Sequence, residues 1–146
     1  MDIRALFKGT KEAKKFKAGK TICAEGTPGD VMYVILDGEL EVSAGGTLIE
    51  VAKPGDVVGE MALIDTKARS ATVVAKTDCR LVPLNEKRFL VLVHQTPIFA
   101  LLVMRTLADR LRRMIAAHAP LSARAVTNET ERRPEHRVRV GEAHLA

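Results

Sequence analysis

Short apolar segments separated by turn-forming residues fill the chain from Gly19 to Leu84. Gly, Pro and Asp stand between consecutive segments, as in GTPGD at residues 26–30 and KPGD at residues 53–56. Strands this short, regularly spaced and without intervening helices, are typical of antiparallel barrels and sandwiches. The sequence therefore predicts a mainly β domain of that class.

Two hairpins are predicted inside this region from local turn signals. Asp37-Gly38 is a dipeptide that favours a type I′ turn, and it separates the apolar segment 31–36 from the alternating segment 39–43. Thr77-Asp78 separates the segments 70–76 and 79–84 in the same way. We therefore expect the two segments of each pair to be antiparallel neighbours.

The hydrophobic period changes after Pro83 and becomes helical. Asn85 is a suitable N-cap for a helix over residues 86–93, and Pro97 suits the first turn of a longer helix over residues 97–118. An apolar stripe with alternating spacings of three and four runs along this longer helix: Leu101, Met104, Ala108, Leu111 and Ile115. Such a stripe packs on the barrel or forms a seam with a second copy of the chain. Since it spans three heptads or fewer, we expect it to pack within the chain.

The two ends of the chain differ from its middle in composition. Residues 1–20 carry seven basic residues against two acidic ones, whereas residues 21–60 carry one basic residue against eight acidic ones. The basic end could touch phosphates, but it has no interleaved aromatic pattern, so we interpret it as a solvated short helix and loop. Residues 120–146 contain two prolines, mixed charge and no aromatic residue, which indicates a disordered tail. The expected domain is residues 1–119.

Composition excludes several other classes of protein. No apolar run approaches the roughly 18 residues that span a bilayer, and the first residues lack the apolar core of a signal peptide, so we expect a cytoplasmic protein. Cys23 and Cys79 lack CxxC spacing, so they are interpreted as buried small side chains. The histidines are not clustered as metal ligands: His94, His118, His136 and His144. We expect neither a metal nor a cofactor.

A carboxylate and a guanidinium lie close together among small residues between positions 59 and 72. Gly59 precedes what can be only one helical turn, Glu60 to Ile64, whose first N–H groups suit an anion. Arg69 adds a charge and paired donors, and Glu60 can accept hydrogen bonds from hydroxyl groups. Phosphate beside hydroxyl indicates a sugar phosphate, whereas the alternative is that Glu60 and Arg69 pair with each other at the rim of the barrel.

The same stretch resembles the phosphate-binding cassette of cyclic-nucleotide-binding domains. That cassette has the approximate pattern Phe-Gly-Glu-x-Ala-Leu, a short loop, then Arg-small-Ala-Thr. Here it stands as Gly59 to Leu63, a loop of five residues, then Arg69 to Thr72. The resemblance extends over about residues 12–115 and includes glycines at positions 19, 26, 29 and 38, which we interpret as turn residues.

Two positions depart from the pattern of the family. Val58 stands where Phe is usual, and Ala68 stands where Pro often precedes the Arg. Neither change removes a ligand contact, but both are expected to loosen the cassette. The resemblance implies an antiparallel β-roll, similar to a double-stranded jelly roll, with a short N-terminal helix, a short cassette helix and two C-terminal helices.

The resemblance also implies roles for individual residues. Arg69 would pair with the cyclic phosphate and Glu60 would hold the ribose 2′-hydroxyl, with further contacts from Gly59, Met61, Ala62, Ser70 and Ala71. Ser70 is compatible with guanine or adenine, and we expect cAMP to be preferred over cGMP. Arg110 or Met114 of the last helix is a candidate cap for the base, and a solvated face is the alternative for Arg110.

Several functions remain to be compared. Related transcription regulators continue into a helix-turn-helix, which needs about 60 further residues, whereas only 27 follow Ala119. No nucleophile paired with a base is recognisable, so neither specific DNA binding nor enzymatic activity is expected. The sequence favours a cyclic-nucleotide sensor that moves its C-terminal helix and so acts on a protein partner or a second copy. The alternatives are an interaction scaffold with a degenerate β-roll, or a regulatory domain truncated from a transcription regulator or a channel.

Overall fold

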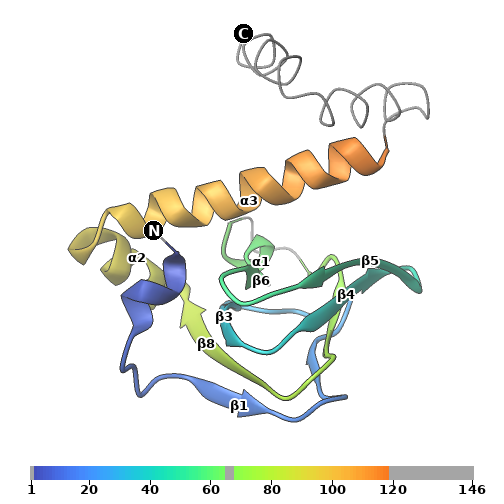
Figure 1. The fold of residues 1–146 in the computed structure, drawn as a ribbon, viewed down its shortest axis with the longest axis horizontal. Helices are drawn as coiled ribbons and strands as arrows, with labels where there is room; N and C mark the ends of the chain where they lie inside the picture. The colour runs from blue at the N-terminus through green and yellow to red at the C-terminus, as the bar shows by residue number, and fades with distance from the viewer. Residues whose placement is uncertain (1, 65–67, 119–146) are drawn as a thin grey trace, which may run out of the picture. The chain divides into compact units, whose positions relative to one another are not determined.

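A computed structural model describes residues 2–64 and 68–118, and these residues form two four-stranded antiparallel sheets (Figure 1). One sheet has the strand order β1-β8-β3-β6 and the other has the order β2-β7-β4-β5. The predicted mainly β architecture, an antiparallel roll, is confirmed. The strands are β1 (Lys14–Phe16), β2 (Thr21–Cys23), β3 (Val31–Asp37), β4 (Leu40–Ala44), β5 (Thr47–Ala52), β6 (Val57–Val58), β7 (Thr72–Ala75) and β8 (Cys79–Asn85).

Both predicted hairpins are wrong in their pairing, although their strands exist. β3 and β4 lie in different sheets, and so do β7 and β8. Instead, β3 pairs with β8 and β4 pairs with β7, so that the ribbon of β3 and β4 runs antiparallel to the ribbon of β7 and β8 through both sheets. The Asp37-Gly38 turn therefore carries the chain from one sheet to the other.

The two crossing points lie against each other, which explains the need for Gly38. Gly38 has a φ of 88°, and a Cβ there would lie 2.5 Å from the carbonyl oxygen of Asp78. The amide of Lys76 donates to the carbonyl of Glu39 at 2.9 Å, and the amide of Glu39 donates to the hydroxyl of Thr77 at 3.0 Å. The dipeptide Asp37-Gly38 suits both a hairpin within one sheet and a turn that carries the chain into the other sheet, so the sequence alone does not distinguish these two arrangements.

Two further features concern the edges of the sheets. β4 and β5 form a hairpin at Gly45 and Gly46, whose φ values of 59° and 79° suit a tight turn. β1 lies inside the Lys-rich segment that was interpreted as a solvated helix and loop, and it pairs with β8 from Lys14 to Phe16. The basic character of β1 fits its place at the end of a sheet, where charged side chains discourage pairing with other chains.

Alternation along the strands separates two hydrophobic cores. Met32, Val34 and Leu36 of β3 face one core, whereas Ile35 of the same strand faces the other. The core between the two sheets is lined by Cys23, Ile35, Leu40, Ala52, Val58, Val73, Ala75, Cys79 and Leu81. The outer core lies between one sheet and the helices, and contains Ile3, Phe7, Met32, Val34, Leu36, Val57, Val82, Leu84, Phe99, Leu102 and Val103.

The helices begin and end near their predicted positions. The N-terminal turn is a short 3₁₀ helix, η1 (Ile3–Phe7), and the cassette turn is α1 (Met61–Ile64). α2 (Glu86–Gln95) begins at its predicted N-cap, because the Asn85 side chain accepts from the Arg88 amide at 2.8 Å. η1 and α2 lie on the same side of the roll (Figure 1), and aromatic edges join Phe7 and Phe89 to Phe99 of the last helix, α3 (Ile98–Ala117).

The predicted apolar stripe of α3 is not its buried face. Phe99, Leu102 and Val103 are buried, whereas Leu101 and Met104 are exposed. Leu111 and Ile115, further along the stripe, are 58% and 62% exposed, and Ala108 is half-buried. The expectation that the stripe packs within the chain is therefore wrong: the first turns of α3 carry apolar residues on two faces, and the core takes the neighbouring one.

By its internal contacts the chain forms two compact units, residues 1–107 and residues 108–146. The second unit begins within α3, and the predicted tail at 120–146 lies outside the described residues. In the described part of the chain, no single helix is long and apolar enough to span a membrane. α2 and α3 together meet the length and composition of a span, but a bend of 116° separates them.

Candidate functional site

The candidate site lies between β6 and β7, where the chain leaves one sheet and enters the other. Gly59 follows β6 directly with a φ of 76°, a left-handed conformation that side chains rarely adopt. α1 then makes a single turn, with the amides of Ala62 and Leu63 donating to the carbonyls of Gly59 and Glu60 at 3.3 and 3.0 Å. The predicted turn from Glu60 to Ile64 is thus present, beginning one residue later.

Glu60 is the buried charged residue of this segment, with 9% of its surface exposed. Its neighbours Met61 and Ala62 face in opposite directions, since Met61 is exposed and Ala62 is buried. Burial raises the pKa of the Cys23 thiol on β2, the positive charge of Arg69 opposes that rise, and the negative charge of Glu60 adds to it. Both predicted charges therefore act on one position in the interior of the roll.

The Arg69 guanidinium is oriented by two backbone carbonyls. Nη1 donates to the carbonyl of Gly59 at 3.0 Å, and Nη2 donates to the carbonyl of Val31 at 2.8 Å. Neither carbonyl has a formal charge, so these bonds fix the direction of the guanidinium without cancelling its charge. The half-buried Arg69 is thus a preset cation beside the cassette turn.

The main chain around Arg69 is fixed by the loop between β2 and β3. The amide of Gly26 donates to the carbonyl of Arg69, and the amide of Arg69 donates to the carbonyl of Thr27, each at 2.8 Å. The amide of Glu25 donates to the hydroxyl of Thr72 at 3.0 Å. This loop, residues 24–30, therefore positions the C-terminal half of the cassette.

The remaining predicted residues are placed as follows. Ser70 is exposed and Ala71 is half-buried, so both are near the surface beside Arg69. Val58 is 3% exposed and packs in the interior core. Arg110 and Met114, the candidate base caps, belong to α3 beyond residue 107, in the second compact unit, so their role remains a prediction.

Sequence reasoning missed Gly29 and Val31 as parts of this arrangement. Gly19, Gly26 and Gly38 have positive φ values, as turn residues do, but Gly29 does not. Val31 contributes only its carbonyl, which any residue could provide. The presence of two glycines in GTPGD was visible in the sequence, but the contact between Gly29 and a residue 40 positions later was not.

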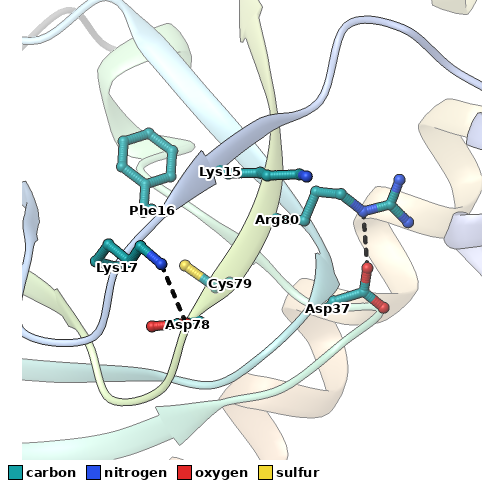
Figure 2. Close-up of a pocket in the computed structure, with 7 residues that line it drawn as sticks. All are labelled: Lys15, Phe16, Lys17, Asp37, Asp78, Cys79 and Arg80. Carbon is teal, nitrogen blue, oxygen red and sulfur yellow. Dashed lines mark hydrogen bonds and ion pairs between the residues drawn. The ribbon is translucent and has the colours of Figure 1, made fainter.

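Away from the cassette, a hollow with a volume of about 540 Å³ lies beside β1 and the start of β8 (Figure 2). Arg80 there donates to the Asp37 carboxylate at 2.7 Å, and Lys17 lies 3.8 Å from Asp78. Two of its three basic side chains are therefore partly neutralised, the third being Lys15. The lining of this hollow has no counterpart of the buried Glu60 carboxylate or of the Arg69 guanidinium held by carbonyls. No group of potential metal ligands occurs within residues 2–64 and 68–118.

Comparison with known proteins finds a matching family and similar relatives. A family model described as the cyclic nucleotide-binding domain matches residues 13–96. The cAMP-dependent protein kinase regulatory subunit of Aspergillus niger is 41% identical over 88 residues, which cover 59% of this chain and 21% of that protein. A cGMP-dependent protein kinase of Caenorhabditis elegans is 40% identical over 73 residues, which cover 50% of this chain and 9% of that protein.

A solved structure shows a similar fold at a lower level of identity. The crystal structure of the Thermus thermophilus catabolite activator protein aligns with a TM-score of 0.61 and 29% identity. The alignment covers 74% of this chain and 58% of that chain. The matched region is therefore one part of each of these longer proteins.

Proposed function

Because the chain belongs to the cyclic nucleotide-binding domain family, we propose that it binds one 3′,5′-cyclic nucleotide at the cassette between β6 and β7. In this proposal Arg69 pairs with the cyclic phosphate and Glu60 accepts from the ribose 2′-hydroxyl. The backbone and side chains around them complete the site: Gly59, Met61, Ala62, Ser70 and Ala71. The observation that carries the proposal is the Arg69 guanidinium, held by neutral carbonyls beside the buried carboxylate of Glu60.

The chemistry of the ligand matches this pair of charges. A cyclic phosphate carries one negative charge, whose transfer into a pocket costs several kcal/mol unless a counter-charge and hydrogen bonds offset it. Arg69 supplies the counter-charge with a fixed orientation. Glu60 would repel the phosphate directly, but as an acceptor for a hydroxyl on the adjoining ribose it selects a nucleotide over inorganic phosphate.

We propose that the site prefers cAMP over cGMP. The name of the Aspergillus niger relative specifies cAMP, whereas that of the Caenorhabditis elegans relative specifies cGMP. Ser70 is exposed and its hydroxyl suits either base. Parallel titrations with both nucleotides decide between them.

The proposed role is regulatory and cytoplasmic, with no catalysis, metal or cofactor. The named relatives include a regulatory subunit and a kinase, in which the matched region is one part of a larger protein. The exposed residues of the α3 stripe, Leu101, Met104, Leu111 and Ile115, form a surface for a protein partner or a second copy of the chain. A scaffold that binds no nucleotide is the competing function, and the preset guanidinium favours the sensor.

Thermal unfolding with and without ligand tests nucleotide binding. At a hundredfold excess over Kd, a ligand that binds only the folded state stabilises it by about 2.7 kcal/mol. We expect cAMP to raise Tm and 5′-AMP, which lacks the ring phosphate, to raise it much less. No shift with millimolar cAMP or cGMP would exclude the sensor and favour the scaffold.

Light scattering and hydrogen exchange test the proposed coupling. We expect cAMP to change either the molar mass of the protein or the exchange protection of the amides in α3. A monomer with identical protection of α3 in both states would show that the nucleotide is not coupled to this helix.

A further inference from the structure

Gly29 lies against the Arg69 guanidinium so closely that no side chain fits between them. A Cβ built on Gly29 would lie 2.7 Å from Nη2 of Arg69, and closer still to Nε and Cζ. Real Cβ atoms do not approach other heavy atoms to such distances. The guanidinium thus occupies the space that any other residue at position 29 would fill.

The conformation of Gly29 does not explain why it is a glycine. Gly26 in the same loop has a φ of 81°, and Gly59, whose carbonyl accepts from the guanidinium, has a φ of 76°, so both suit glycine by backbone alone. Gly29 has no such positive φ, so the strain that disfavours a side chain at Gly26 and Gly59 does not apply to it. The absence of a side chain at position 29 therefore leaves space for Arg69.

The loop between β2 and β3 holds Arg69 from several directions. The main chain of Arg69 is paired with Gly26 and Thr27, and Nη2 donates to the carbonyl of Val31 at 2.8 Å. From the cassette side, the carbonyl of Gly59 accepts from Nη1 at 3.0 Å. Gly29 allows the guanidinium to reach both carbonyls at once.

We infer that Gly29 is a positioning residue for Arg69, which presets the guanidinium for the phosphate of the ligand. The inference deepens the proposed function and rests on it only for its effect on nucleotide affinity. An added methyl group at position 29 would displace the guanidinium end of the flexible Arg69 side chain, and the strands would stay in place. The chain then keeps its fold while Arg69 loses its orientation.

The first experiment compares Gly29→Ala with Gly9→Ala by calorimetric titration with cAMP. Gly9 also has a positive φ, of 73°, and a Cβ there meets nothing within 4 Å, so that variant strains the backbone outside the loop that holds Arg69. We expect Gly29→Ala to raise Kd about tenfold or more, with little loss of Tm. We expect Gly9→Ala to lower Tm and to change Kd by less than about threefold. Equal increases in Kd would overturn the inference.

The second experiment repeats Gly29→Ala in an Arg69→Lys background. A lysine ammonium lacks the planar guanidinium that fills the space beside Gly29, so the added methyl group has less to displace. If Gly29 acts through Arg69, its substitution changes Kd by less than about threefold in this background. An effect as large as in the parent would show that Gly29 acts in another way.

The third experiment needs no ligand and therefore separates this inference from the proposed function. The Nε–H resonance of Arg69, assigned by its loss in Arg69→Lys, is recorded in the free protein. We expect Gly29→Ala to shift or broaden it and Gly9→Ala to leave it in place. An unchanged resonance in Gly29→Ala would overturn the inference, whereas failure of the parent to bind cAMP and cGMP would overturn only the proposed function.

Discussion

Arg69 and Arg80 occupy two regions of the same roll and are held by different kinds of partner. Arg69, half-buried beside the cassette, donates to the carbonyls of Gly59 and Val31. Arg80, at the edge of the hollow, donates to the carboxylate of Asp37 at 2.7 Å, and the Asp37 side chain is 63% exposed to solvent. The two arginines thus share a charge but differ in what surrounds it.

The difference shows how a structure can orient a cation without neutralising it. A carboxylate cancels the charge of its partner, and an exposed pair of this kind contributes little to stability. Carbonyl oxygens align the guanidinium and leave its formal charge for an anion. The four predictions below test this contrast between the cassette and the hollow.

The largest effect on binding is expected at Arg69. Arg69→Ala removes the counter-charge of the phosphate, so cAMP binding should weaken by roughly 3 kcal/mol, about a hundredfold in Kd. Arg80→Ala removes the same charge from the hollow and should change Kd by less than about twofold. Calorimetric titration of the two variants measures both, and a folded Arg69→Ala protein that binds within threefold of the parent would place the phosphate elsewhere.

A smaller effect is expected at Glu60. Glu60→Ala removes an acceptor for the ribose hydroxyl, which water can replace at the mouth of the site, so the loss should be about 1 to 2 kcal/mol. Glu39→Ala removes a half-buried carboxylate that lies 3.8 Å from Lys76, and it serves as the control. A loss from Glu60→Ala that also occurs with 2′-deoxy-cAMP would contradict a contact with the 2′-hydroxyl.

The two cysteines report on the same two regions through their reaction with alkylating reagents. Burial raises the pKa of both thiols. The free energy of unfolding that the neutral thiols contribute is therefore fully present below the usual thiol pKa, and it is lost as pH rises through the raised pKa. Labelling should therefore still accelerate with pH near pH 9, where an unfolded thiol begins to level off. Saturating cAMP should slow labelling of Cys23, beside Arg69, at least about twofold, and leave Cys79 in the hollow unchanged. Mass spectrometry of labelled peptides separates the two, and equal protection would remove the contrast.

The smallest effect is expected for the Arg80–Asp37 pair. Since 43% of the Arg80 side chain and 63% of the Asp37 side chain are exposed, the double-mutant coupling energy should be about 0.2 to 1 kcal/mol. Urea unfolding at low and high salt measures this coupling, which salt should weaken further. A coupling above about 2 kcal/mol would mean that the hollow holds its cation as firmly as the cassette does.

The sequence predicted the strands and the helical turn of the cassette well, because both depend on residues close together in the chain. The turn signals mark where strands end, and the cassette pattern from Gly59 to Thr72 is nearly continuous. The positions of β3, β4, β7 and β8 are accordingly confirmed. Their pairing was not predictable from the same signals, since Asp37-Gly38 crosses between sheets where it was expected to reverse within one.

Two other misses have the same physical origin. Gly29 matters because it lies close to Arg69 in space. Nothing in the segment GTPGD distinguishes Gly29 from a turn residue. On α3, the spacing of Leu101 and Met104 is helical, yet Phe99, Leu102 and Val103 fill the outer core. Periodicity identifies an apolar face but does not decide between two faces when both are apolar.

The arrangement of the crossings between the sheets also has a consequence for how the chain folds. Glu39 meets Thr77 across 38 residues and Asp37 meets Arg80 across 43 residues, so neither crossing is complete when its own turn forms. The entropy of closing these loops is lost before the pairing of β3 with β8 and of β4 with β7 is gained. Chains dominated by such distant pairings fold in about milliseconds to seconds, far more slowly than helical bundles. The β4–β5 hairpin closes locally, whereas the ribbon of β3 and β4 and the ribbon of β7 and β8 must meet across the whole middle of the chain.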